Sequence, residues 1–132
     1  FCFANCSSLS SFIISSAEEV TLGQQAFDIC KNLETVDVFA RSKFKASCFC
    51  FNKAYKIKRI TINSRNILIG SRCFNYCSLL SQINCPIAKN IKFFENSFNG
   101  LHFSECLKHP DEAKLDSFKS NLNYNHNECK IV

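Results

Sequence analysis

The sequence predicts an α/β solenoid in which every repeat of 23 to 24 residues supplies one short parallel strand and one helical turn. Three observations predict it: a recurring phenylalanine, small and aliphatic residues at fixed distances after it, and a V-x-V step that closes each copy. The phenylalanines, separated by 24, 24, 23 and 24 residues, are Phe3, Phe27, Phe51, Phe74 and Phe98. Several columns that share one period make a stronger signal than any single motif.

The segment after each phenylalanine carries the spacing expected of a helical turn. Small residues come three positions later, and they are Cys6, Cys30, Ala54, Cys77 and, less well matched, Leu101. Aliphatic residues follow three positions further on, as Leu9, Leu33, Ile57 and Leu80. Apolar residues at this spacing lie on one face of a helix, so we expect about two helical turns per copy at most.

The next step has the alternation of a strand with one buried face. Its buried columns are Phe12, Val36, Ile60, Ile83 and Leu107, and then Ile14, Val38, Ile62 and Cys85. Stacked copies would bring these strands together in parallel at ~4.8 Å. The alternate positions then face outward, as candidate ligand-binding residues: Ser11, Ile13, Thr35, Asp37, Arg59, Thr61, Gln82 and Asn84.

Two further apolar columns precede each phenylalanine. One holds Val20, Phe44, Ile67 and Ile91, and the other Leu22, Ala46, Ile69 and Phe93. The complete copy therefore reads V-x-L-G-x-x-A-F-x-x-C-x-x-L-x-x-V-x-V, and it decays in the fifth copy.

These motifs resemble the BspA-like leucine-rich repeats, in particular the blocks AFDICKNLETVDV and CFNYCSLLSQINCP with Pro86 after the strand. The resemblance implies a leucine-rich-repeat solenoid and, by association, a surface or adhesion-type protein that binds a protein partner. Its departures, Ala54 for Cys and Ser47 and Phe94 for Gly, are ordinary repeat drift. We expect the solenoid to cover residues 1–101 in about four repeats, as a fragment truncated at its N-terminus.

Residues 102–132 are more polar and are expected to form a C-terminal cap or tail, because a solenoid needs a polar end. The stretch DEAKLDSFKSNL after Pro110 is the predicted helix, with proline at its start and acids in its first turn.

The 10 cysteines fit core packing better than chemistry. Those of the solenoid share small columns with Ala and Ser, and a free cysteine packs as a small hydrophobe. Adjacent copies place Cys50 and Cys73 near the separation that a disulfide tolerates, so oxidation of that pair stays open.

An alternative function uses the tail and a basic stripe. Cys106, His109, His126 and Cys129 have paired spacing that could close a tetrahedral zinc site and staple the tail. Residues 41–72 hold only cationic charged residues and could bind an anionic partner. A nucleic-acid partner is not expected, because Phe44 and Phe51 fall in core columns and cannot stack on bases.

The sequence offers no recognisable catalytic arrangement and no cofactor motif, so we expect neither catalysis nor a cofactor. No apolar run reaches the ~18 residues of a membrane span. The resemblance favours the cell surface, while unpaired thiols would be equally stable in a reducing cytoplasm.

Overall fold

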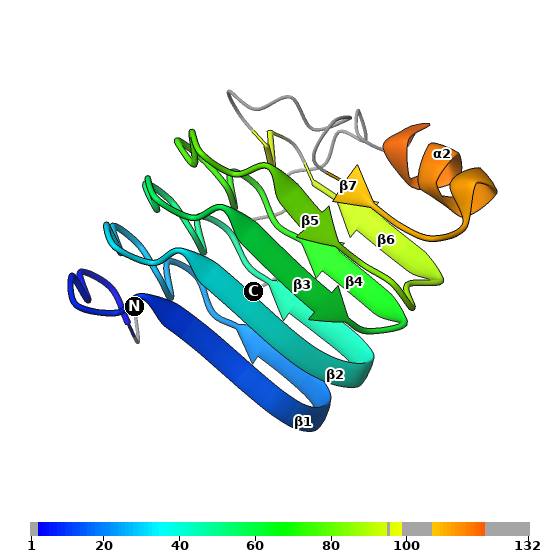
Figure 1. The fold of residues 1–132 in the computed structure, drawn as a ribbon, viewed down its shortest axis with the longest axis horizontal. Coiled ribbons are helices and arrows are strands. Elements are labelled where there is room, and N and C mark those ends of the chain that lie inside the picture. Colours follow the sequence, from blue (N-terminus) through cyan, green and yellow to red (C-terminus); the bar gives the residue numbers. More distant parts are fainter. Residues whose placement is uncertain (1–2, 95, 99–106, 121–132) are drawn as a thin grey trace.

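The computed structural model, which describes residues 3–94, 96–98 and 107–120, is a solenoid of stacked parallel strands (Figure 1). Its long strands come first, β1 (Ser11–Leu22) and β2 (Thr35–Ala46). Shorter ones follow: β3 (Arg59–Asn63), β4 (Asn66–Ile69), β5 (Gln82–Asn84), β6 (Asn90–Phe93) and β7 (Leu107–Lys108). Helix α2 (Glu112–Ser120) lies at the C-terminal end of the stack.

The strands form one parallel sheet in the order β6-β4-β2-β3-β5-β7, with β1 paired to β2, and this sheet is bent into two arms (Figure 1). The first arm contains residues 11–14 of β1, residues 35–39 of β2, and β3, β5 and β7. The second arm contains residues 17–22 of β1, residues 43–46 of β2, and β4 and β6. Strands β1 and β2 run through the bend, where β1 shifts register between Ile14 and Ala17.

The predicted columns are confirmed as ladders of the first arm. Val36 pairs with Ile60, Ile60 with Ile83, and Ile83 with Leu107. The two columns upstream of each phenylalanine also form strand, in the second halves of β1 and β2 and in β4 and β6, since Phe44 pairs with Ile67 and then Ile91. The first four coils thus contribute strand to both arms, as one long strand in the first two and as two short strands in the next two, where the sequence predicted one short strand, because those columns also alternate between buried and exposed positions.

The helical turn predicted for each repeat is not confirmed. Around Phe27, Phe51 and Phe74 the chain forms a series of β-turns, in which the Cys30 N–H donates to the Phe27 carbonyl at 3.3 Å. The third residue of these turns has positive φ, 57° at Gln25 and 56° at Ile29, as type II turns require. The intervening N–H groups point to the next coil, since Phe27 donates to Cys50 and Ile29 to Asn52, both at 2.8 Å.

The turn series replaces the helix for a physical reason. A helix would direct every backbone N–H along its own axis, to the residue four positions earlier. Here half of the donors bind within the coil and half bind its neighbour, so the turns extend the hydrogen bonding of the strands around the solenoid edge. Stacking between coils thereby overrides the local spacing that indicated a helix.

Between the arms and the turns lies a core built from repeated residues. Phe27, Phe51 and Phe74 stack nearly parallel, with ring centroids 5.2 and 5.4 Å apart, and Phe98 continues the stack at 5.1 Å from Phe74. Phe3 begins it, 5.1 Å from Phe27. The central three rings are at most 1% exposed. This phenylalanine stack explains why the column recurs.

Most of the solenoid cysteines that the structure describes are buried, as predicted, and Cys6 is half-buried. Among the cysteines that the structure describes, none is disulfide-bonded, and Cys30, Cys50, Cys73, Cys77 and Cys85 are buried. Burial raises the pKa of the Cys77 and Cys85 thiols to about 12. The Cys77 and Cys85 thiols therefore stay protonated at neutral pH.

The C-terminal segment adds one rung and a helix. Strand β7 pairs with β5, and the helix predicted after Pro110 is confirmed as α2. The Asp111 carboxylate caps α2 by accepting the N–H groups of Ala113 at 3.0 Å and Lys114 at 3.2 Å. Phe118 is 4% exposed and joins the core cluster. Within the described part of the chain, no helix has the length and apolarity that crossing a membrane requires.

Candidate functional site

The predicted binding residues lie on one face, the outer side of the first arm. Their inward neighbours Val36 and Ile60 are at most 1% exposed, so alternation directs the residues between them away from the core. The strand register arranges them in two ladders, the first through Ser11, Thr35, Arg59 and Gln82. The second runs through Ile13, Asp37, Thr61 and Asn84, and Lys108 continues it on β7. We call this set the strand face.

The strand face combines fixed and accessible polar groups. Arg59 and Gln82 are exposed, while Asp37, Thr61 and Asn84 are half-buried. The Asn84 side-chain amide donates to Thr61 Oγ1 at 3.4 Å, which links two neighbouring strands. The face therefore offers both charge signs and several amide and hydroxyl groups.

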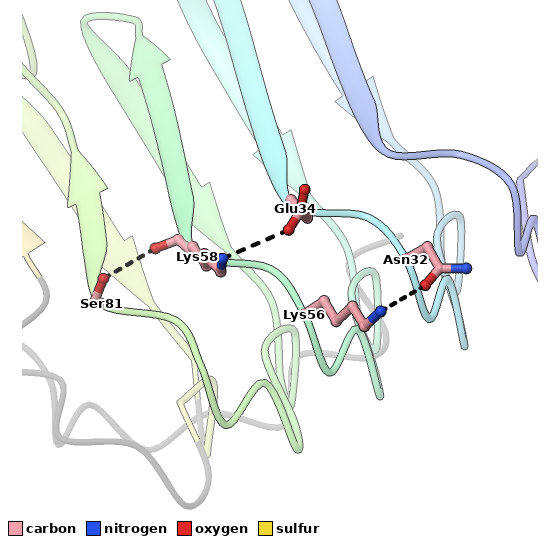
Figure 2. Close-up of polar contacts among 5 residues, drawn as sticks. All are labelled: Asn32, Glu34, Lys56, Lys58 and Ser81. Atoms are coloured by element: carbon pink, nitrogen blue, oxygen red, sulfur yellow. Dashed lines mark hydrogen bonds and ion pairs between the residues drawn. The ribbon is translucent and has the colours of Figure 1, made fainter.

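A polar rim borders the strand face where the chain enters the strands of the first arm (Figure 2). Glu34 and Lys58 form an exposed ion pair at 3.6 Å, and the Lys56 ammonium donates to Asn32 Oδ1 at 3.1 Å. Ser81 Oγ donates to the Lys58 carbonyl at 3.3 Å. Exposed pairs of this kind add little stability. These contacts hold the charged side chains of Glu34, Lys56 and Lys58 in defined positions beside the strand face.

Sequence reasoning missed one apolar member of this face. Phe39 pairs with Asn63 at the end of the first arm and is 37% exposed, and Ile13 on the same face is 64% exposed. The alternation that placed Thr35 and Asp37 outward continues to Phe39 and would have identified it. Exposed aromatic and aliphatic side chains are typical anchors of protein interfaces.

The zinc hypothesis stays a prediction, because Cys106, His126 and Cys129 lie outside the described residues. The fourth candidate, His109, has both ring nitrogens near backbone groups: Nε2 lies 3.0 Å from the Ala88 carbonyl oxygen, and Nδ1 accepts from the Asp111 N–H at 3.0 Å. Its ring also packs against Phe118 at 5.5 Å. Within the described part of the chain, these contacts make His109 a support for the start of α2.

The basic stripe of residues 41–72 does not form one patch. It is longer than one repeat, so its residues are distributed around the solenoid: Arg59 lies on the strand face, Lys43 on the second arm and Arg72 among the turns. Phe44 and Phe51 are 1% exposed, as expected for core columns, so neither ring can stack on a base.

Comparison with known proteins agrees with this architecture. The family model of the BspA type Leucine rich repeat region matches residues 1–130 in 6 copies. Neither the curated proteins nor the solved structures gave a match. Because the family match covers nearly the whole chain, the protein belongs to the BspA-type leucine-rich repeat family.

Proposed function

We propose that this protein is a non-catalytic binding module that engages a protein partner through the strand face. The observation that carries the proposal is the strand register, which brings Thr35, Arg59 and Gln82 into one ladder and Asp37, Thr61 and Asn84 into the other. Leucine-rich repeats generally mediate protein interactions, and the BspA type is typically associated with surfaces. By that association we place the protein at the cell surface, in an adhesion-type role.

The dimensions of the strand face indicate the strength of binding. Five strands at ~4.8 Å and up to five residues at ~3.3 Å give a flat footprint of about 20 by 16 Å, or ~300 Å². A standard stable interface buries ~800 Å² on each partner. The rim around Lys56 and Lys58 would therefore have to contribute, and we expect transient contacts of roughly micromolar affinity for this chain alone.

A display experiment tests the proposal without a known partner. Peptides are selected from a random library on the immobilised folded protein, and their affinities are then compared for two variants with the same substitution. Thr61→Lys alters the centre of the strand face, whereas Thr21→Lys alters an outward position of the second arm. We expect Thr61→Lys to weaken most selected binders by about tenfold, and Thr21→Lys to change them less than about twofold.

The contrary result is equally clear. If most selected binders lose affinity with Thr21→Lys and keep it with Thr61→Lys, the first arm is not the preferred contact surface. Circular dichroism of both variants ensures that only folded proteins are compared. Antibody labelling of intact cells tests the proposed location separately, and the cell-surface assignment is wrong if labelling requires permeabilisation.

A further inference from the structure

The opposite side of the solenoid carries a second surface with a different charge pattern. Outward positions of the second arm form two ladders, Glu19, Lys43, Asn66 and Asn90 in one and Thr21, Lys45, Leu68 and Lys92 in the other. At the bend, successive coils supply Arg41, Arg65 and Lys89, which are linked through the backbone, since Arg65 N–H donates to the Arg41 carbonyl at 3.3 Å and Lys89 N–H to the Arg65 carbonyl at 2.8 Å; we call these three residues the bend column. Over residues 41–46, 65–69 and 89–93, all charged residues are cationic.

A groove of about 390 Å³ runs across this surface, lined by Lys43, Asn66, Leu68, Asn90 and Lys92 among others. The groove is lined mainly by apolar atoms, and its polar part is ordered by a chain of amides. Asn90 Nδ2 donates to Asn66 Oδ1 at 2.9 Å, and Asn66 Nδ2 donates to the Ser42 carbonyl at 2.8 Å. We call these lining residues, with Arg65 and Lys89 at their border, the basic groove.

The bend column indicates which kind of ligand group its cations can pair with. Arg41 lies 3.6 Å from the carboxylate of Glu18, which the preceding coil supplies. For Arg65 the preceding coil supplies Arg41, and for Lys89 it supplies Arg65. Neither Arg65 nor Lys89 has an ion pair to any described residue. Arg65 and Lys89 directly precede the paired residues Asn66 and Asn90, and like charges on neighbouring strands repel, so a carboxylate from outside the chain would relieve these two cations as Glu18 does for Arg41.

We propose that the basic groove binds an acidic peptide segment in an extended conformation. Acidic side chains at alternate positions of an extended chain lie ~6.6 Å apart, whereas adjacent rungs lie ~4.8 Å apart, so the long side chains of Arg65 and Lys89 can each reach one of two such acids. The groove volume fits a few residues. Phe93 and Phe94 are at most 4% exposed, so the groove offers no free aromatic face for nucleic-acid bases. This surface is separate from the strand face and is independent of the function proposed there.

Fluorescence anisotropy with a labelled short peptide of alternating Glu and Ser tests the proposal. Binding should be measurable at low ionic strength, weaken at physiological ionic strength, and be lost when Gln replaces Glu in the peptide. The double variant Lys43→Gln with Lys89→Gln removes two cations from the groove and should raise Kd by at least about tenfold.

A matched control removes two cations from the turn edge instead, by Lys31→Gln with Arg72→Gln. Gln25 already occupies the turn position that Arg72 holds, so this change suits the backbone there. The control should raise Kd by less than about twofold. Equal losses in the two double variants would show that net charge alone attracts the peptide and would overturn the proposal.

Two more measurements complete the test. Asn66→Leu breaks the amide chain while keeping every charge, and it should weaken peptide binding about threefold or more if the groove recognises its ligand by shape. An anionic polysaccharide fragment or a single-stranded oligonucleotide that binds the groove more tightly than the Glu–Ser peptide would also overturn the assignment to an acidic peptide. Thermal melts of all variants confirm that the folded state is being compared.

Discussion

The phenylalanine stack should be the most sensitive element of the solenoid, and Phe74 is its best probe. The Phe74 ring is 1% exposed and lies between Phe51, at 5.4 Å and 3°, and Phe98, at 5.1 Å and 17°. Phe74→Ala removes a fully buried aromatic side chain, which costs about 3–5 kcal/mol of unfolding free energy. That is a large share of the ~5–15 kcal/mol stability of a domain.

Phe74→Leu separates stacking from simple burial. Leucine retains most of the apolar volume but loses both ring contacts, each worth about 0.5–1 kcal/mol, so we expect a loss of about 1–2 kcal/mol. Urea unfolding followed by circular dichroism measures both variants, since the chain has no Trp to report by fluorescence. Coincident midpoints at different wavelengths would support two-state unfolding.

Leu79→Ala is the control, because Leu79 is 51% exposed and should cost less than ~0.5 kcal/mol. If Phe74→Leu costs no more than Leu79→Ala, the rings do not hold neighbouring coils together. A loss of several kcal/mol with Phe74→Leu would instead show that leucine cannot fill the site, and that ring shape decides the packing.

Two further predictions concern the thiols and the turns. Burial raises the pKa of the Cys77 and Cys85 thiols to about 12, against about 8.5 in an unfolded chain. Unfolded thiols then lose protons first, so the free energy of unfolding is unaffected below about pH 8.5 and falls as the pH rises toward 12, by up to ~1.4 kcal/mol per pH unit for each thiol. Cys85→Val, which copies Val38 of the same column, should flatten this alkaline loss in urea titrations, and an unchanged slope would refute the assignment. Tyr76 has φ of 62° and is 58% exposed, so Tyr76→Gly should stabilise the protein by about 0.5–1 kcal/mol. Ser78→Gly, exposed and without positive φ, should destabilise by a similar amount through the unfolded chain; thermal unfolding measures both, and shifts of the same sign would contradict the turn geometry.

The sequence predicted the ladders of equivalent residues correctly but the local backbone conformation incorrectly. Both outcomes have the same cause. Phe27 and Phe51 recur because identical positions of adjacent coils touch, and a period in the sequence records such contacts directly. The spacing of Phe27, Cys30 and Leu33 recurs for the same reason, but three-residue steps fit successive β-turns as well as a helix. Only the hydrogen bonds from Phe27 to Cys50 and from Ile29 to Asn52, in the next coil, distinguish the two.

The outward-facing residues show the same difference between what the sequence predicted and what only the structure decided. Alternation alone placed Thr35, Asp37, Arg59 and Thr61 on one face, because side chains of a strand point to opposite sides in turn. The second arm was not predicted, although its apolar columns were recognised in the sequence. An apolar column identifies buried positions, but it does not by itself show that these positions belong to a strand.

The sequence by itself determined the repeat, its period, the core columns and the family, because these depend on contacts between equivalent positions. Only the tertiary structure decided that successive coils bring Arg41, Arg65 and Lys89 together at the bend, and that the other cations of the basic stripe are scattered around the coil. Residues a full repeat apart become neighbours when coils stack, whereas residues close in sequence are carried to different sides by the bend and the turns. The charge surfaces that could select a partner are therefore a property of the stacked coils.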